Sequence, residues 1–388
     1  MESIDIYSGD KVISRVMAEE SLAGLEACLK PYAHVFAVMD RAVAVHCPAA
    51  AEIADVLNRR NVPGMLMDAS ECHKTMETVM EICTWLLENG ADRDALVLAV
   101  GGGITTDMTG FAASIYKRGV RFAYVPTTLL AQVDAAIGGK TGVNFEKYKN
   151  ILGVIRQPEF TYMCPQVLES LPRRDFLSGA AEMLKTFVIE DGGCYARAVE
   201  LLSGMSEEYE NGRRETSEAD PWGDTVGRHT RELAELIAAA ARVKAGVVSR
   251  DQFEKGERRK LNLGHTFAHA IETLAQKDGG ERFKCCEDDG MPGVTHGEAV
   301  AMGMVLAARL ADRYYRNDSA AITEREVARG LKNCGIRCTC PYSVQEMADI
   351  MRKDKKAEGG KVHFVLPKAI GDVEAVELSV EEAVALMA

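Results

Sequence analysis

The order of apolar and polar positions divides the chain into two regions of different texture. Between Val35 and about Pro126, short apolar runs alternate with amphipathic stretches. These segments are VFAVMD (35–40), METVMEICTWLLENG (76–90), ALVLAVGGG (95–103) and RFAYVPTT (121–128). Such alternation of strands and helices is typical of a parallel sheet with helices on its faces. We therefore predict an α/β domain in the first part of the chain.

Beyond Leu171 the pattern changes to long segments rich in Ala, Leu and Glu. The stretches 231–248 and 296–315 are predicted helices with broad apolar faces. A chain of 388 residues is also longer than one hydrophobic core usually supports. We predict an α/β domain over residues 1–170 and a mostly α-helical domain over residues 171–388.

Two further stretches, 206–224 and 276–293, are charged, contain glycine and have no helical or strand period. These properties predict exposed or partly disordered loops on the helical half.

Composition and charge limit the partners of the protein. Lys and Arg number 46 against 58 Asp and Glu, a net charge of −12, which disfavours nucleic acid and anionic membranes as partners. No apolar run approaches the roughly 20 residues that a membrane span needs, and the N-terminus lacks the basic and apolar regions of a signal peptide. The 11 cysteines are scattered through a long chain, which favours reduced thiols. We expect a cytoplasmic protein in which any phosphate chemistry uses a focused pocket.

The run ALVLAVGGGITTD (95–107) ends a predicted strand in three glycines and continues into helix-forming residues. Glycines at this place let backbone N–H groups approach a pyrophosphate, and the helix N-terminus adds a favourable dipole. The run is not GxGxxG, so a simple tight turn is the alternative.

Polar and basic residues follow the predicted strand at 121–128. Thr127, Thr128, Gln132 and Asp134 flank its end; Gly138, Gly139 and Lys140 are predicted to form a flexible, phosphate-binding loop, and Lys147, Lys149 and Asn150 add further donors. Solvated lysines on a loop are the alternative for any one of them. For the cluster of Lys353, Lys355 and Lys356, the sequence supports an anion clamp and a solvated loop equally.

Two residues in SGAAEMLK (178–185), Glu182 and Lys185, are spaced to share one face of a helix. The pair by itself favours an ordinary surface salt bridge, because such pairs are common and contribute little energy.

The motif HTFAH (265–269) places His265 and His269 four apart, so that both imidazoles of a helix could reach one zinc ion. A metalloprotease helix would have Glu directly after the first histidine, and Thr266 stands there instead. His296 begins the next predicted helix, close to Glu298. A third histidine and a glutamate add enough possible ligands to favour a catalytic divalent metal site. Spacing alone leaves open whether His269 or a distant carboxylate such as Glu182 is the third ligand.

Six stretches, taken in order, resemble the 3-dehydroquinate synthases, the sugar phosphate cyclases of the shikimate pathway. They are GGGITTDMTGF (101–111), YKRGVRFAYVPTTLLAQVDAAIGGKTGVN (116–144), LPRRDFLSGAAEMLK (171–185), RRKLNLGHTFAHAIE (258–272), HGEAVAMGM (296–304) and DKK with FVLP (354–367). The resemblance extends from about Asp40 to Pro367. It implies a Rossmann-like NAD-binding domain followed by a mostly helical metal-binding domain.

The resemblance also implies roles for individual residues. A divalent ion, zinc or cobalt, would be held by Glu182, His265 and His296, while His269 would contact the substrate and help move protons. NAD would be bound by Asp40, Glu71, Lys74, Gly102, Gly103, Asp107, Thr127, Thr128, Lys140 and Lys149.

The implied substrate is 3-deoxy-D-arabino-heptulosonate 7-phosphate, which the family converts to 3-dehydroquinate and phosphate by transient oxidation, elimination, reduction and aldol closure. Its phosphate would be held by Arg118, Lys140, Asn150, Lys185, Arg258 and Lys355 or Lys356. Its hydroxyls and carboxylate would meet Asp134, Lys244 and Asn262. The family forms homodimers in which the residue matching Arg118 reaches into the partner subunit.

The chain departs from the family pattern at three places. Thr105 and Thr106 change the usual glycine turn, Ala268 stands where a glycine often precedes the second histidine, and 276–293 is an insertion. Rival interpretations are another sugar phosphate cyclase, a metal-dependent polyol dehydrogenase that releases NADH, and a metal- or nucleotide-binding module without activity.

Overall fold

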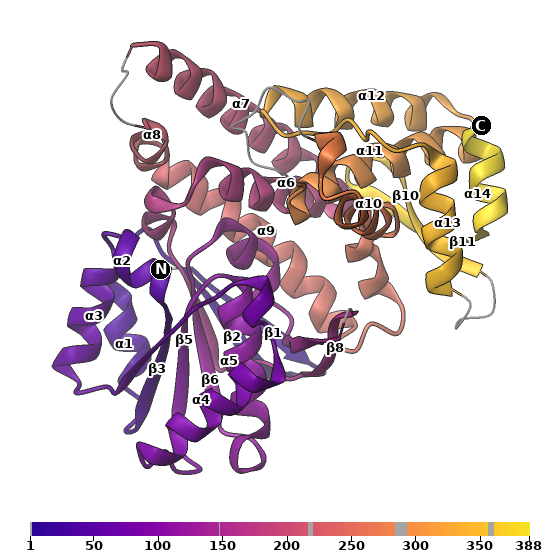
Figure 1. Ribbon diagram of the computed structural model, residues 1–388. Helices are drawn as coiled ribbons and strands as arrows, with labels where there is room; N and C mark the ends of the chain where they lie inside the picture. The colour runs from indigo at the N-terminus through magenta and orange to yellow at the C-terminus, as the bar shows by residue number, and fades with distance from the viewer. Residues whose placement is uncertain (1, 147, 216–219, 284–292, 356–360) are drawn as a thin grey trace. The chain divides into compact units, whose positions relative to one another are not determined.

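The computed structural model describes residues 2–146, 148–215, 220–283, 293–355 and 361–388 (Figure 1). The chain forms two compact units, each built from two segments. The first contains Met1–Phe176 and Gly212–Phe253, and the second contains Leu177–Asn211 and Glu254–Ala388. The domain boundary at residues 170 and 171 stays a prediction, because compactness does not establish an independently folding domain.

The first unit is organised around a seven-stranded sheet in the order β1-β2-β9-β6-β5-β3-β4. Only β1 and β2 pair antiparallel; the other neighbours are parallel. The strands are β1 (Glu2–Ser8), β2 (Lys11–Ala18), β3 (Val35–Asp40), β4 (Gly64–Met67), β5 (Leu96–Gly101), β6 (Arg121–Pro126) and β9 (Phe160–Met163). The predicted parallel sheet is therefore confirmed, while its antiparallel edge had no predicted counterpart.

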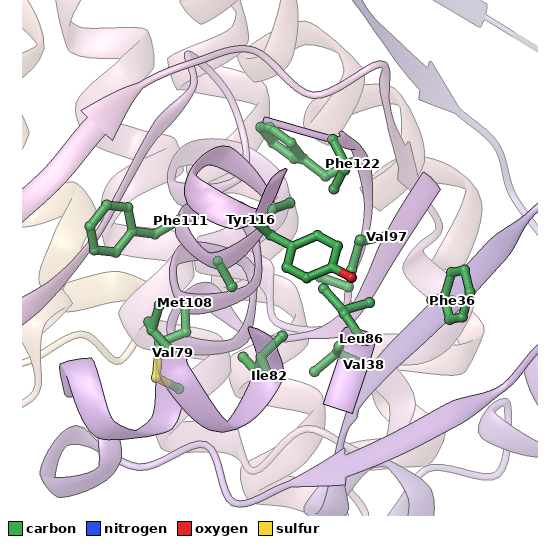
Figure 2. Packing of buried hydrophobic residues seen from close by; sticks show 14 of the residues in the cluster. Phe36, Val38, Val79, Ile82, Leu86, Val97, Met108, Phe111, Tyr116 and Phe122 are labelled. Atoms are coloured by element: carbon green, nitrogen blue, oxygen red, sulfur yellow. The ribbon is translucent and has the colours of Figure 1, made fainter. Parts of the chain in front are cut away.

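The central strands are buried on both faces, as continuous apolar runs require. The helices α4 (Met76–Glu88) and α5 (Gly103–Ile115) cover one face with their apolar sides. Figure 2 shows this core. Its labelled side chains are Phe36, Val38, Val97 and Phe122 from the strands, and Val79, Ile82, Leu86, Met108, Phe111 and Tyr116 from the helices and the turn after α5.

The order of the strands reverses between β3 and β5. From β3 the chain continues to its neighbour β4 on one side, then returns to β5 and β6 on the other side. Open sheets bind ligands outside the carboxyl ends of the strands at such a reversal. Asp40 ends β3 and Gly101 ends β5, so the predicted glycine turn lies at this point.

The rest of the first unit consists of helices and one hairpin. These elements are α1 (Leu25–Leu29), α2 (Arg41–His46), α3 (Ala50–Arg59), α8 (Trp222–Arg228), α9 (Thr230–Arg250), β7 (Lys140–Phe145) and β8 (Tyr148–Ile155). The predicted helix at 231–248 is α9, and it packs on β1, where Ser249 Oγ accepts a 2.9 Å hydrogen bond from Tyr7 N. This packing explains why residues 212–253 belong to the first unit.

The second unit is mostly helical. Its elements are α6 (Arg173–Glu190, which begins in the first unit), α7 (Gly192–Glu215, which ends in the first unit), α10 (His265–Lys277), α11 (His296–Tyr315), α12 (Asp318–Asn333), α13 (Val344–Lys355), α14 (Val380–Met387), and the hairpin of β10 (Lys361–Ala369) with β11 (Asp372–Ser379). The predicted helix at 296–315 is α11, and nearly every side chain of its first four turns is buried. Among the described residues, no helix is both long and apolar enough to cross a membrane.

The predicted loop at 206–224 is wrong in large part, whereas the described residues of the predicted loop at 276–293 form turns after the end of α10 at Lys277. Within 206–224, α7 continues to Glu215 and α8 begins at Trp222, because Tyr209 and Trp222 are buried apolar anchors among the charges. Within 276–293, a short 3-10 turn at Glu281–Phe283 buries Phe283; residues 216–219 and 284–292 lie outside the described part. The predicted flexible loop of Gly138, Gly139 and Lys140 is shorter than expected. Lys140 is the first residue of β7 and belongs to the β7–β8 hairpin.

Candidate functional site

A glycine contact in the second unit brings His296 toward Glu182. Gly297 follows His296 at the start of α11, and its backbone N–H donates a 2.9 Å hydrogen bond to Ser178 Oγ on α6. A Cβ atom at Gly297 would collide with the backbone of Ser178, so only glycine permits this approach. Glu182 lies one helical turn after Ser178 and therefore faces the beginning of α11.

A second glycine contact places His265. Gly264 precedes α10 with φ 79°, and a Cβ there would lie 2.8 Å from Met304 N on α11. Gly303 makes the reciprocal approach, since its Cβ would lie 3.2 Å from the backbone N of Ala268. The close packing of α10 on α11 thus fixes the helix end that carries His265.

These contacts assemble a group of three potential metal ligands. Glu182, His265 and His296 each offer a ligand atom, and these atoms all lie within 4.8 Å of one another. Glu182 Oε1 is 3.9 Å from His265 Nε2 and 3.3 Å from His296 Nε2. One carboxylate and two imidazoles suit Zn²⁺ or Co²⁺ and leave further coordination positions for a substrate. The residues present therefore fit a divalent metal.

Charges around this group favour its use as a ligand set. Burial, together with the Lys185 ammonium, lowers the pKa of His265 to about 3, so its imidazole is neutral at pH 7. Burial also lowers the pKa of His296, but hydrogen bonds from its ring N–H groups to the Glu182 and Glu272 carboxylates outweigh that effect and raise it. The imidazole of His296 is accordingly held among negative charges, where a cation is favoured.

The pair Glu182 and Lys185 is buried, with exposed side-chain fractions of 0% and 1%. The two side chains form an ion pair inside the second unit. The sequence interpretation of an ordinary surface salt bridge is therefore wrong. It failed because local spacing does not reveal that α6 is enclosed by other helices.

The other candidate ligands stand apart from the group of three. His269 is not among the residues whose ligand atoms lie within 4.8 Å of one another, and its side chain is exposed on α10. Glu298 completes a capping box with Thr295 at the start of α11, accepting a 2.7 Å hydrogen bond from Thr295 N. Of the alternatives that spacing left open, the geometry favours Glu182 as the third member.

A polar network in the first unit connects several predicted cofactor residues. Lys74 is buried, and its Nζ donates 2.6 Å hydrogen bonds to Asp107 Oδ2 and Asn150 Oδ1. Asn144 Nδ2 donates to Glu71 Oε1 over 2.8 Å, and Asn144 Oδ1 accepts from Asn150 N over 3.0 Å. Burial raises the pKa of Asp107 to about 6, although Lys74 opposes this shift.

Two more predicted residues of the first unit form an ion pair. Lys244, buried on α9, donates to the carboxylate of Asp134, and to the Asp134 carbonyl over 2.6 Å. Asp134 lies in a π-helical turn at Ala131–Ala135. Residues separated by a long stretch of sequence are thus brought together by the packing of α9 against this turn.

The glycine turn and the threonines adjoin each other at the ends of β5 and β6. Gly102 is the N-cap of α5 and Gly103 its first residue, so the turn leads directly into a helix N-terminus. A Cβ at Gly102 would lie 3.0 Å from Thr128 Cγ2, and Thr127 N donates to Gly101 O over 2.9 Å. Asp40 caps α2 through a 3.0 Å hydrogen bond from Ala42 N.

The remaining predicted residues are dispersed over the two units. In the second unit, Arg258 is buried in a 3-10 turn (Glu257–Asn262), and Asn262 Nδ2 donates to Glu254 Oε1 over 2.7 Å. In the first unit, Lys140, Lys149 and Arg118 are exposed, and Arg118 has a positive φ of 70°. Lys356 and the side chain of Lys355 lie outside the described part.

Three residues of these networks had no predicted role. Glu272 Oε1 is 3.3 Å from His296 Nδ1, Asn144 joins Glu71 to Asn150, and Glu254 accepts from Asn262. For Glu272 the signal was present, because it lies on the same face of α10 as His265 and His269. The contacts of Asn144 and Glu254 depend on tertiary packing and left no local pattern.

Comparison with solved structures gives the class of protein. The fold matches that of 2-epi-5-epi-valiolone synthase from Streptomyces hygroscopicus subsp. jinggangensis, solved with NAD⁺ and Zn²⁺ bound. The TM-score is 0.77 and the identity 27%, over 97% of this chain and 96% of that one. The architecture is therefore that of the sugar phosphate cyclases.

Comparison of sequences gives the family. Profiles described as 3-dehydroquinate synthase N-terminal and C-terminal match residues 64–178 and 179–357. The 3-dehydroquinate synthase of Picosynechococcus sp. is 38% identical over 311 residues, 79% of this chain and 76% of its relative. That of Bacillus mycoides is 32% identical over 387 residues, 98% and 96% of the two chains. The chain belongs to the 3-dehydroquinate synthase family.

Proposed function

We propose that this protein converts 3-deoxy-D-arabino-heptulosonate 7-phosphate to 3-dehydroquinate and phosphate, the reaction of the shikimate pathway for which its relatives are named. The observation that carries the proposal is the convergence of Glu182, His265 and His296 in a chain that matches the family over both of its parts. The reaction needs a divalent cation and NAD⁺, and both are bound in the solved valiolone synthase.

The chain offers residues for both groups. Glu182, His265 and His296 would hold the cation, and the residues around the β3–β5 reversal would hold NAD⁺, namely Asp40, Glu71, Lys74, Gly102, Gly103, Asp107, Thr127, Thr128, Lys140 and Lys149. When bound, the cation lowers the pKa of a substrate hydroxyl and NAD⁺ accepts a hydride and returns it. The N-terminus of α5 directs backbone N–H groups at the place where a pyrophosphate would lie.

Basic residues would bind the phosphate of the substrate in an otherwise acidic protein. Arg258 and Lys185 are nearly inaccessible to solvent, and a desolvated cation binds an oxyanion more strongly than an exposed one does. We propose that they act with Lys140, Asn150, Arg118 and Lys355 or Lys356, and that they hold phosphate in position as it leaves. The ordering of the leaving group lowers the barrier of the elimination.

Other residues would act on the rest of the substrate. His269 presents an exposed imidazole one helical turn from His265, where it can exchange protons with a bound sugar. Asp134, Lys244 and Asn262 would contact hydroxyl and carboxylate groups. In both cases a hydrogen-bonded partner, Lys244 for Asp134 and Glu254 for Asn262, restricts the side chain before substrate arrives.

Assembly and location form part of the same proposal. We propose a homodimer in which Arg118 of one protomer serves the site of the other; Arg118 is exposed in a single chain, as this role requires. We also propose that the protein works in the cytoplasm, and that residues 1–170 and 171–388 are its two domains.

The test is a reaction with purified protein, a divalent ion and a catalytic amount of NAD⁺. Inorganic phosphate and 3-dehydroquinate should appear in equal amounts, and a chelator should stop both. Absence of both products with metal present would reject the proposal. In a parallel reaction with NAD⁺ in excess over substrate, one NADH formed for each substrate consumed would indicate a dehydrogenase. Turnover of a different sugar phosphate alone would indicate another cyclase.

A further inference from the structure

The imidazole of His296 lies between two carboxylates in the second unit. Its Nε2 is 3.3 Å from Glu182 Oε1, and its Nδ1 is 3.3 Å from Glu272 Oε1. Glu272 is on α10, on the face that also carries His265 and His269. The Glu272 side chain is 17% exposed and that of His296 is 37% exposed, so the carboxylate is the better shielded of the two.

The other histidine of the group shows the same arrangement with a different acceptor. His265 Nδ1 is 3.2 Å from the carbonyl oxygen of Leu263, while its Nε2 faces Glu182. A carbonyl oxygen can only accept, so Nδ1 of His265 carries the proton and Nε2 has a free lone pair. Both imidazoles thus direct Nε2 at the same carboxylate and Nδ1 at an outer acceptor.

We propose that Glu272 is a positioning residue for the metal centre. Its carboxylate accepts a hydrogen bond from Nδ1–H of His296, which fixes the ring orientation and makes Nε2 a stronger electron donor. Outer carboxylates of this kind typically change the affinity of a metal site by about 10- to 100-fold. The inference rests on the proposed metal centre at Glu182, His265 and His296, and it assigns Glu272 no contact with the ion or the substrate.

Two substitutions distinguish the hydrogen-bond acceptor of Glu272 from its negative charge. Glu272→Gln keeps an oxygen that can accept from Nδ1–H but loses the charge, whereas Glu272→Ala removes both. Glu207→Gln is the matched control, because Glu207 is exposed on α7 of the same unit and has no part in the site. Melting temperatures of the metal-free proteins identify any variant that is simply unfolded.

The measurement is Zn²⁺ affinity by competition with a chromophoric chelator. We expect Kd to rise about 10- to 100-fold in Glu272→Ala and by a smaller factor, about three- to tenfold, in Glu272→Gln. Glu207→Gln should match the unmodified protein. A Kd for Glu272→Ala within about twofold of the unmodified value would overturn the inference.

The visible absorption of the Co²⁺-loaded protein supplies a reading that is independent of turnover. A reoriented His296 changes the ligand field, so the Co²⁺ bands should shift in both Glu272 variants and stay fixed in Glu207→Gln. If Glu272→Ala does not fold, Glu272→Gln decides: unchanged bands together with unchanged affinity contradict the role. Loss of Zn²⁺ in Glu182→Ala and His265→Ala tests the metal centre itself, so failure there is distinguished from failure at Glu272.

Discussion

Lys74 Nζ donates a 2.6 Å hydrogen bond to Asp107 Oδ2, and the two side chains are 7% and 18% exposed. Removing one partner of such a buried pair leaves the other charge uncompensated, which costs about 3 kcal/mol or more. We expect Lys74→Met to lower the free energy of unfolding by this amount, measured by urea denaturation at pH 8. The double variant Lys74→Met with Asp107→Asn should recover part of the loss, and strictly additive losses would contradict the coupling.

Asp107 also makes stability depend on pH in a definite direction. Its pKa is raised by burial from 3.8 to about 6, so the folded state holds the proton more tightly than the unfolded state. The resulting stabilisation is present below about pH 4 and is lost as pH rises through about 6, on the order of 2 to 3 kcal/mol in all. The difference in stability between the unmodified protein and Asp107→Asn should therefore change between pH 4.5 and pH 7.5. Parallel curves would show that Asp107 keeps an ordinary pKa.

The two histidines of HTFAH should respond differently to substitution. His265→Ala removes a member of the ligand group and should lose bound metal, measured by elemental analysis after dialysis. His269 lies outside that group, so His269→Ala should keep the metal and lose the rate of phosphate release, by about 10²- to 10⁴-fold if it moves protons. Equal loss of metal in both variants would contradict the assignment.

The contact of Gly297 with Ser178 should be intolerant of a single methyl group. Gly297→Ala forces α11 away from α6, separates His296 from Glu182 and should destabilise the protein by about 1 to 3 kcal/mol, with weaker Zn²⁺ binding.

Gly204 supplies the control for this prediction. It is an exposed residue of α7 with open space around a new Cβ, so Gly204→Ala should stabilise the protein by about 0.5 to 1 kcal/mol through helix propensity. Melting curves and chelator competition measure both variants. A Gly297→Ala protein with unchanged melting and metal affinity would show that the contact is dispensable.

Local pattern predicted the elements that have a clear period or a continuous apolar run. β3, β5 and β6 are buried runs bounded by turns, and α9 and α11 follow broad apolar faces, so all of them were found. The end of α7 was missed, because its charged residues hide the buried anchor Tyr209. The β7–β8 hairpin was missed because glycines and lysines suit a loop as well as an edge strand.

The candidate site was likewise predicted only where its residues follow a local pattern. Helical spacing placed His265 and His269 on one face, and the acidic background made individual basic residues conspicuous. The networks of Lys74 with Asp107 and Asn150, and of Lys244 with Asp134, join residues far apart in the chain. Spacing carries no information about such contacts.

By itself the sequence determined the alternation of strands and helices, the glycine turn and the histidine spacing, because each of these depends on neighbours within a few turns of chain. Histidine spacing left open whether Glu182 or His269 joins His265 and His296, and the tertiary structure brings Glu182 to them. The physical reason is steric: bare backbone at Gly297 and Gly264 lets α11 approach α6 and α10 closely, and that approach selects which side chains meet.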